Sequence, residues 1–72
     1  MSVPSKVLHQ FAKRLREMRL AKGISQEKLG ALAGVHRTYI GMLERAEKNI
    51  TLANMEKIAK GLGVRLRDLI DF

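Results

Sequence analysis

The stretch Gln26 to Arg45, QEKLGALAGVHRTYIGMLER, constrains the fold of this chain more than any other stretch. It predicts two short amphipathic helices that meet at Gly34, where a steep corner needs a residue that tolerates positive φ. Gly30 is small at the point where the second helix must pass close to the first. Helical spacing lets five apolar residues face one shared core: Leu29, Ala33, Val35, Ile40 and Leu43. We therefore predict a corner between helices at about residues 26–33 and 37–46.

The outer face of the second helix carries residues that this core does not use: Arg37, Thr38, Tyr39, Gly41 and Met42. Two interpretations of the corner are open. Any helical bundle can contain a tight corner for structural reasons alone. Alternatively, the outer face contacts a partner, and the charge of the surrounding sequence favours this second interpretation.

The formal net charge is +7, and the excess is concentrated in the first two-thirds of the chain. Residues 6–48 carry ten basic and four acidic side chains, whereas residues 49–72 carry four and three. A cationic surface of this density suits a polyanion, either nucleic acid or an acidic membrane surface, because neutralised phosphates release counterions. The alternative is a solvated surface that keeps a small protein soluble without contacting a partner.

The size and composition of the chain restrict its class. Seventy-two residues suffice for one domain, spanning residues 1–72. There is no Cys and there are only two His residues, so we expect no disulfide, no metal site and no cofactor. Neither His9 nor His36 has a partner for catalysis evident in the sequence, so we expect no enzyme. No apolar run approaches the roughly 20 residues of a membrane span, and no signal peptide is evident, which predicts a cytoplasmic protein.

Helical periodicity outside the corner predicts three more helices and no strand. The first begins after Ser5 and ends near Lys22, and residues 1–4 are expected to form a flexible arm. Another begins after Thr51 and ends at the glycines 61 and 63, and a last short helix covers about residues 66–70. The apolar faces of the two longer helices are assigned to the core: Leu8, Phe11, Leu15, Met18, Leu52, Met55, Ile58, Ala59 and Leu62. The predicted fold class is all-α, with five helices.

From Leu15 to Ile70 the chain resembles the Cro and lambda-repressor type of helix-turn-helix regulator, the Xre family. The resemblance runs through LREMRLAKGISQEKLGALAGVHRTYIGMLERAEKNITLANMEKIAKGLGVRLRDLI. Within it, RTYIGMLERAEKNITL and KIAKGL are also similar to the controller proteins of restriction-modification systems. The resemblance implies a compact lambda-repressor-like domain with its second and third helices as the helix-turn-helix. The third, the recognition helix, would enter the major groove of DNA while the second lies across the backbone.

Three residues depart from the usual pattern of the family. His36 replaces the common Ser or Thr at the start of the recognition helix, and Ile50 stands where many members have Pro. Arg65 occupies a position often given to Ser. Because His is a poor N-cap compared with Ser or Asp, we expect a weakly capped recognition helix.

Four residues of the recognition helix are assigned to DNA base contacts: Arg37, Thr38, Tyr39 and Met42. Arg37 can donate two hydrogen bonds to guanine O6 and N7, which is the commonest specific contact. Thr38 can bond a base or a phosphate, and Tyr39 can bond a phosphate through its hydroxyl or pack on a sugar. Met42 either contacts a thymine methyl group or belongs to the rim of the core.

Four other residues are assigned to the DNA backbone: Gln26, Arg45, Lys48 and Asn49. Gln26 resembles the family glutamine that contacts the backbone and braces the recognition helix. The other three follow the recognition helix and are candidates for holding a flanking phosphate, with a solvated charge as the alternative for Lys48. The family pattern also places Arg19 and Glu44 as a partly buried structural ion pair.

These assignments predict a sequence-specific regulator of transcription that binds double-stranded DNA. One module offers few contacts, so we expect a homodimer on a near-palindromic operator. Leu66, Leu69 and Ile70 are the predicted dimer interface, unless they seal the core of the monomer. No small-molecule ligand and no membrane partner are expected. Two other functions are open: an antitoxin that binds a toxin protein and regulates its own gene, and a non-specific nucleic-acid binder.

Overall fold

The computed structural model describes residues 5–72, which form five α-helices. Their bounds are α1 (Lys6–Ala21), α2 (Gln26–Ala33), α3 (Arg37–Glu44), α4 (Leu52–Leu62) and α5 (Leu66–Leu69). These residues include no strand, so the all-α prediction is confirmed. The flexible arm predicted at residues 1–4 lies outside the described residues.

The predicted caps account for where the helices begin. Ser5, Ser25 and Thr51 each accept a hydrogen bond, at 3.0 to 3.2 Å, from the backbone N–H three residues further along. Each bond satisfies one of the free N–H groups in the first turn of α1, α2 or α4. Helix α2 ends at Gly34, whose φ of 74° is the left-handed conformation that the corner requires.

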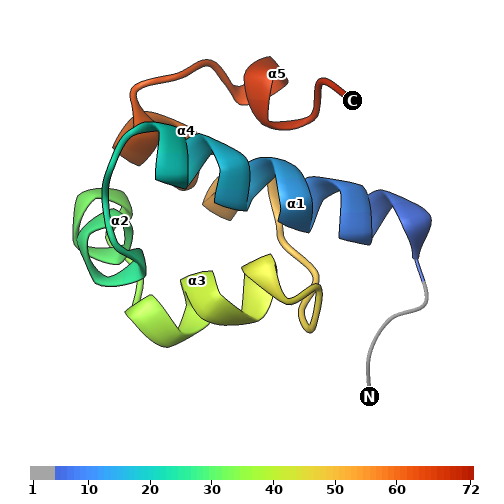
Figure 1. The fold of residues 1–72 in the computed structure, drawn as a ribbon, viewed down its shortest axis with the longest axis horizontal. Coiled ribbons are helices and arrows are strands. Elements are labelled where there is room, and N and C mark those ends of the chain that lie inside the picture. Colours follow the sequence, from blue (N-terminus) through green and yellow to red (C-terminus); the bar gives the residue numbers. More distant parts are fainter. Residues whose placement is uncertain (1–4) are drawn as a thin grey trace.

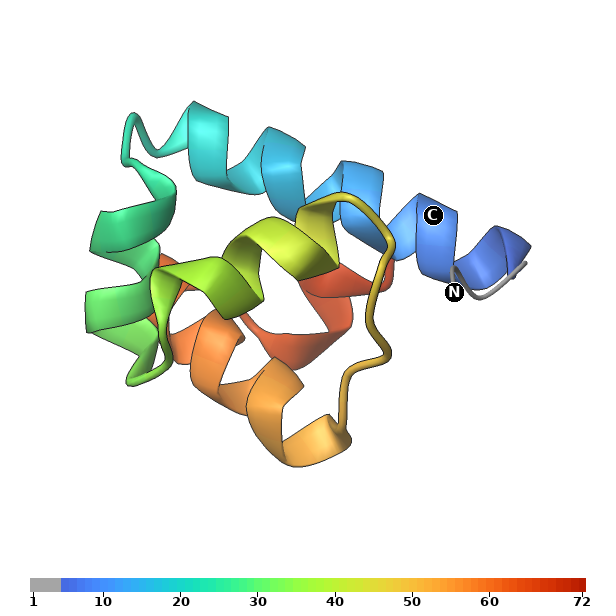
Figure 2. The same cartoon turned by 90° about the horizontal axis from the view of Figure 1, so that it is seen from below.

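The helices enclose one main core, and α3 packs on it with one side only. Helix α2 packs on both α3 and α4, α1 packs on α3, and α4 packs on α5 (Figure 1). The view in Figure 2 looks directly onto α3, which lies in front of the other helices. The fully buried large side chains of this core come from every helix: Leu15, Leu29, Ile40, Leu43, Ile58, Leu62 and Leu69. Packing on one side of α3 therefore leaves its other side free.

Two predictions about the core and the recognition helix are wrong. Leu52 is 70% exposed, because the first residue of α4 lies beyond the edge of the core. The recognition helix ends at Glu44 and not at Ala46, because Ala46 has a left-handed φ of 58°. The N–H of Glu47 donates to the carbonyl of Met42 at 2.9 Å, which closes the end of the helix as in a Schellman motif.

Ala46 occupies a position where Gly is usual, and its burial gives the reason. It is 1% exposed and packs with Leu8 and Ala12 of α1 in a small second cluster. A glycine would adopt the same backbone conformation with less strain, but it would lose this buried methyl group. The end of the recognition helix is thereby attached to α1.

The short helix α5 is held by polar contacts as well as by its apolar side. The guanidinium Nε of Arg14 donates to the carbonyl oxygen of Asp68 at 2.9 Å, which joins α1 to α5. The carboxylate of Asp68 accepts the backbone N–H of Arg65 at 3.0 Å and places a negative charge in the first turn. This charge offsets the two arginines at the start of α5. Among residues 5–72, no helix combines the length and the apolar character that a membrane span requires.

Candidate nucleic-acid interface

The corner between α2 and α3 is tight because Gly30 has no side chain. A Cβ atom at residue 30 would lie 2.7 Å from the carbonyl oxygen of Val35 and 3.1 Å from the backbone nitrogen of Arg37. Both are backbone atoms of the corner itself, so they cannot move without moving α3. The N–H of Val35 also donates to the carbonyl of Gly30 at 2.9 Å. Gly30 therefore sets how closely the start of α3 approaches α2.

His36 is the N-cap of the recognition helix, the position predicted for it, and its side chain forms a capping hydrogen bond. Its Nδ1 accepts the backbone N–H of Thr38 at 3.0 Å, in the role that a Ser or Asp oxygen usually fills. A ring nitrogen with a lone pair can accept a hydrogen bond just as those oxygens do. The start of α3 is thus ordered by a side chain that sequence preference ranks low.

The predicted base-contact residues differ in their exposure. Arg37 and Thr38 are exposed at the start of α3, and Arg37 Nη1 forms an ion pair with Glu27 Oε2 at 3.0 Å. Tyr39 is half-buried against the core, and its hydroxyl accepts a hydrogen bond from Asn54 Nδ2 of α4 at 3.0 Å. Met42 is half-buried as well. The structure therefore brings two of the four residues to the open surface and leaves the other two on the flank of α3.

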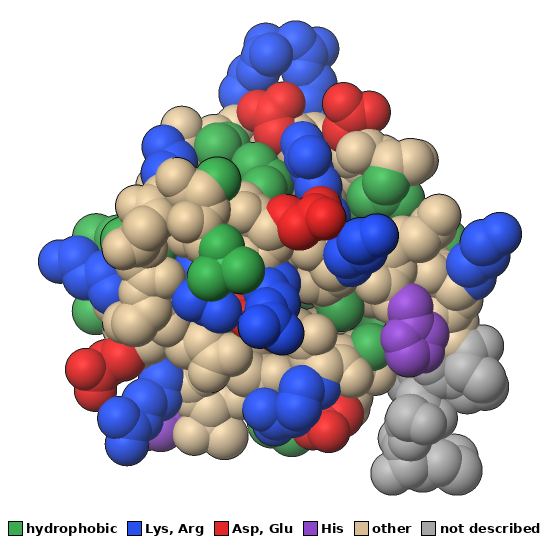
Figure 3. Space-filling model, viewed as in Figure 1, with side chains coloured by type: hydrophobic (Ala, Val, Ile, Leu, Met, Phe, Trp, Pro, Cys, Tyr) green, Lys and Arg blue, Asp and Glu red, His purple; other side chains and the backbone are tan. Residues whose placement is uncertain are grey.

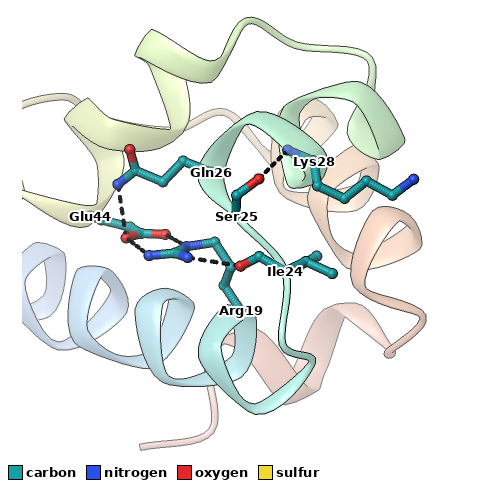
Figure 4. A network of polar contacts seen from close by, with 6 residues as sticks. All are labelled: Arg19, Ile24, Ser25, Gln26, Lys28 and Glu44. Carbon is teal, nitrogen blue, oxygen red and sulfur yellow. Dashed lines mark hydrogen bonds and ion pairs between the residues drawn. The ribbon is translucent and has the colours of Figure 1, made fainter.

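A buried polar network joins α1, α2 and α3 beneath this surface (Figure 4). Arg19 Nε and Nη2 donate to the two carboxylate oxygens of Glu44 at 2.6 and 3.0 Å. The remaining Nη1 of Arg19 donates to the carbonyl of Ile24 at 2.9 Å, and Gln26 Nε2 donates to Glu44 Oε1 at 3.2 Å. The structure thus places Arg19 and Glu44 in contact and links Gln26 to the recognition helix.

The hydrogen bonds that Arg19 donates to Glu44 raise the pKa of Arg19 above its usual value, although burial acts to lower it. A base with a raised pKa in the folded state contributes stability below its unfolded pKa and loses it as the pH rises through the folded pKa. The contribution of Arg19 is therefore complete at neutral pH. Within residues 5–72, every buried side-chain nitrogen and oxygen has a hydrogen-bond partner.

The residues assigned to the DNA backbone come from the start of α2, which carries Gln26, and from the segment that follows α3. Arg45, Lys48 and Asn49 are exposed just after the helix, and Arg45 pairs with Glu47 at 3.0 Å. A Cβ atom on Gly41 would lie 3.0 Å from Arg45 Nη1 and 3.4 Å from Gln26 Oε1. The side chains of Arg45 and Gln26 therefore converge over Gly41, which the sequence alone did not indicate.

Basic side chains are not gathered into a single patch on the face of the molecule drawn in Figure 3. Lys and Arg side chains are spread over the face drawn in Figure 3, with acidic side chains among them.

Two neighbours of the predicted contact residues, Glu27 and Asn54, were not predicted from the sequence. Each lies on a different helix from its partner, ten or fifteen residues away along the chain, and no periodicity relates such positions.

Comparison with known proteins identifies the family. The family model described as Helix-turn-helix (HTH_3) matches residues 15–69. The control protein C.BamHI of Bacillus amyloliquefaciens is 49% identical over 63 residues, which cover 86% of this chain and 78% of that protein. The crystal structure of the restriction-modification controller protein C.AhdI from Aeromonas hydrophila superposes with a TM-score of 0.84 at 47% identity, covering 86% of this chain and 94% of that one.

A second controller protein, C.Esp1396I, is also similar in structure. Its structure matches with a TM-score of 0.82 at 38% identity, covering 85% of this chain and 79% of that one. It has also been solved with single alanine substitutions of an arginine, a threonine and a tyrosine at three successive positions. The same three residue types follow one another here as Arg37, Thr38 and Tyr39. On the family match and these identities, the chain belongs to the Xre-type helix-turn-helix family of DNA-binding transcription regulators.

Proposed function

We propose that this protein regulates transcription by binding a near-palindromic operator in double-stranded DNA, as a cytoplasmic homodimer and without catalysing a reaction. The observation that carries the proposal is the outer face of α3, which lies in front of the other helices while its inner face is fixed by the core (Figure 2). A rigidly held helix with an open face has the form that enters the major groove. The family supports the same mode of binding.

Within this proposal, Arg37 and Thr38 specify bases. Both are exposed in the first turn of α3, and in helix-turn-helix proteins the N-terminal residues of the recognition helix meet the base edges. Tyr39 and Met42 lie deeper on the flank of the helix, so they contact DNA only at the edge of the groove. Tyr39 uses its oxygen as an acceptor for Asn54, which leaves its O–H free to donate to a phosphate or a base.

The backbone contacts fall to the residues around the helix. Gln26 uses one N–H of its amide in the bond to Glu44, so its Oε1 and its second N–H remain available to bind DNA. Arg45 lies beside Gln26 over Gly41. The side chains of Gln26 and Arg45 can bind phosphates of one DNA strand. Lys48 and Asn49 can bind a phosphate beyond the end of α3. Such contacts set the position and orientation of the recognition helix without specifying sequence.

The regulated genes are proposed to be those of a restriction-modification system. This rests on the identities of 49% and 47% to C.BamHI and C.AhdI, which are a control protein and a restriction-modification controller protein by name. A direct test is to isolate bound fragments from the native genome and to locate them relative to genes for a restriction enzyme and its methyltransferase. Bound fragments spread over the genome without a shared sequence would contradict the proposal.

The proposed dimer uses a surface that differs in part from the predicted one. Leu69 is 0% exposed and belongs to the core of the monomer, which was the alternative to a dimer contact for this residue. It therefore cannot contact a second copy. Ile70 is 49% exposed, and Leu66 is half-buried. A hollow of about 210 Å³ lies beside Ile70 and is lined mainly by apolar side chains, among them Val7, Phe11 and Phe72.

A second copy of the chain is the proposed occupant of this surface. Val7 and Phe72 are exposed at the hollow, and Leu52 is exposed one turn before Met55, which also lines it. Large apolar side chains gathered at one place on a small protein mark an interface. A two-fold pair of recognition helices would then meet half-sites about 34 to 36 Å apart.

Ile70→Asp is expected to convert the dimer into a monomer, because it places a charge in the proposed interface. Its side chain is exposed, so the fold of the monomer should be kept. The matched control is Leu32→Asp, since Leu32 is 50% exposed on α2 and does not line the hollow. Sedimentation at micromolar concentration should show a monomer for the first variant and a dimer for the second. A monomer for the unaltered protein, or a dimer for both variants, would contradict this interface.

Arg37→Ala is expected to cost about 1 to 3 kcal/mol of binding free energy and to relax the preference at one base position, because a bidentate contact to guanine is lost. Lys48→Ala should weaken binding to all sequences alike and reduce the salt slope by about one. Selection of bound duplexes from a random pool, followed by titration at fixed salt, measures both effects. An equal loss of affinity for every sequence in Arg37→Ala would show that Arg37 contacts only phosphate.

A further inference from the structure

Arg37, the residue proposed to contact a base, has an acidic neighbour on the other helix of the corner. Its Nη1 donates to Glu27 Oε2 at 3.0 Å, across the short gap that Gly30 permits. Glu27 lies in the first turn of α2, where the helix dipole favours a carboxylate. Arg37 is the first residue of α3, whose first turn has no acidic side chain. Glu27 therefore supplies the counter-charge that α3 itself does not provide.

We propose that Glu27 is a specificity-determining residue that acts through Arg37, a role that rests on the proposed function. The guanidinium has five N–H donors in a planar fork. Only Nη1 is hydrogen-bonded to another of the residues 5–72, so the edge formed by Nε and Nη2 is open. That edge can donate to guanine O6 and N7 while Nη1 stays on the carboxylate. A guanine and Glu27 can thus be bound at the same time.

A phosphate group offers Arg37 less than a guanine does. The charge of the guanidinium is already balanced by Glu27, so its attraction for the DNA backbone is reduced. A phosphate that approaches Arg37 also approaches the carboxylate, whose side chain is 74% exposed, and the two negative charges repel. Glu27 therefore weakens binding to arbitrary DNA more than it weakens binding to a site with guanine at the right position.

The test compares Glu27→Gln with the unaltered protein on two duplexes, one recovered by selection from a random pool and one scrambled duplex of the same composition. The ratio of the two affinities is expected to fall by up to about fivefold, the effect of one exposed ion pair, mainly because binding to the scrambled duplex becomes tighter. The matched control is Glu56→Gln, since Glu56 is exposed on α4 and has no ion pair with any described residue. It removes the same charge and should leave the ratio unchanged.

A second background shows whether Glu27 acts through Arg37. In the Arg37→Ala protein, Glu27→Gln is expected to leave the ratio unchanged, because the guanidinium that it orients is absent. A ratio unaffected by Glu27→Gln in the unaltered background overturns the proposal, and so does a fall of the same size in both backgrounds. If the unaltered protein itself shows no preference between the duplexes, the proposed function fails along with this role, and that result is visible before any substitution is made.

Discussion

Glu44→Ala is expected to lower the free energy of unfolding by about 3 to 5 kcal/mol, because it leaves the buried charge of Arg19 without a partner. The side chains of Glu44 and Arg19 are only 4% and 10% exposed. The substitution removes two hydrogen bonds from Arg19 and one from Gln26. In a domain of this size each kcal/mol corresponds to about 4 to 8 °C, so the melting temperature should fall by more than about 10 °C. Thermal unfolding followed by circular dichroism measures the change.

The double variant Arg19→Met with Glu44→Leu separates the ion pair from the loss of a single partner. Replacing both members of a buried pair by apolar side chains of similar size is often nearly neutral, whereas removing one is costly. The double variant should therefore regain a large part of the stability that Glu44→Ala loses. If Glu44→Ala lowered the melting temperature no more than the exposed substitution Glu56→Ala does, the ion pair would contribute little to stability.

The order and type of the helices could be predicted because local rules decide them. Ser5, Ser25 and Thr51 are strong N-caps, and each helix that follows has apolar residues at helical spacing. Gly34 ends α2 in the conformation that its position required. These signals act over three or four residues, so they are visible without a structure.

The errors arose where packing between distant segments decides the outcome. Ala46 has a left-handed conformation although it is not Gly, and the burial of its methyl group on α1, which accounts for Ala at this position, is not visible in the sequence near residue 46. Leu52 has the spacing of a core residue but lies at the edge of the core, whereas Leu69, predicted at the dimer interface, is completely buried. His36 succeeds as a cap although its residue type is rarely chosen for that role.

The candidate site shows the same division. Residue type and position on α3 were enough to select Arg37 and Thr38 for the exposed face. The hydrogen-bond partners of the proposed contact residues, Glu27 for Arg37 and Asn54 for Tyr39, come from other helices and are visible only in three dimensions. The sequence thus indicates which side chains are able to contact DNA, and the fold determines what holds them in place.

Gly30→Ala is expected to destabilise the fold by about 2 to 3 kcal/mol, although alanine favours a helix by up to about 1 kcal/mol over glycine. The added methyl group would lie 2.7 Å from the carbonyl oxygen of Val35, so α2 and α3 would have to move apart. The melting temperature should fall by about 10 °C or more. An unchanged melting temperature would show that the corner can open without cost.

Gly41→Ala is the matched control, because it makes the same change at a second buried glycine of the helix-turn-helix. Its methyl group would meet the ends of two flexible side chains, Arg45 and Gln26, at 3.0 and 3.4 Å, and no backbone atom among its three nearest neighbours. These side chains can swing away, so the melting temperature should stay the same or rise with the better helix propensity. If Gln26 and Arg45 grip the DNA backbone as proposed, the displaced side chains should weaken binding to all duplexes by a similar factor. The two glycines would then separate the roles of the corner, since residue 30 fixes its shape and residue 41 keeps room for the groups that hold DNA.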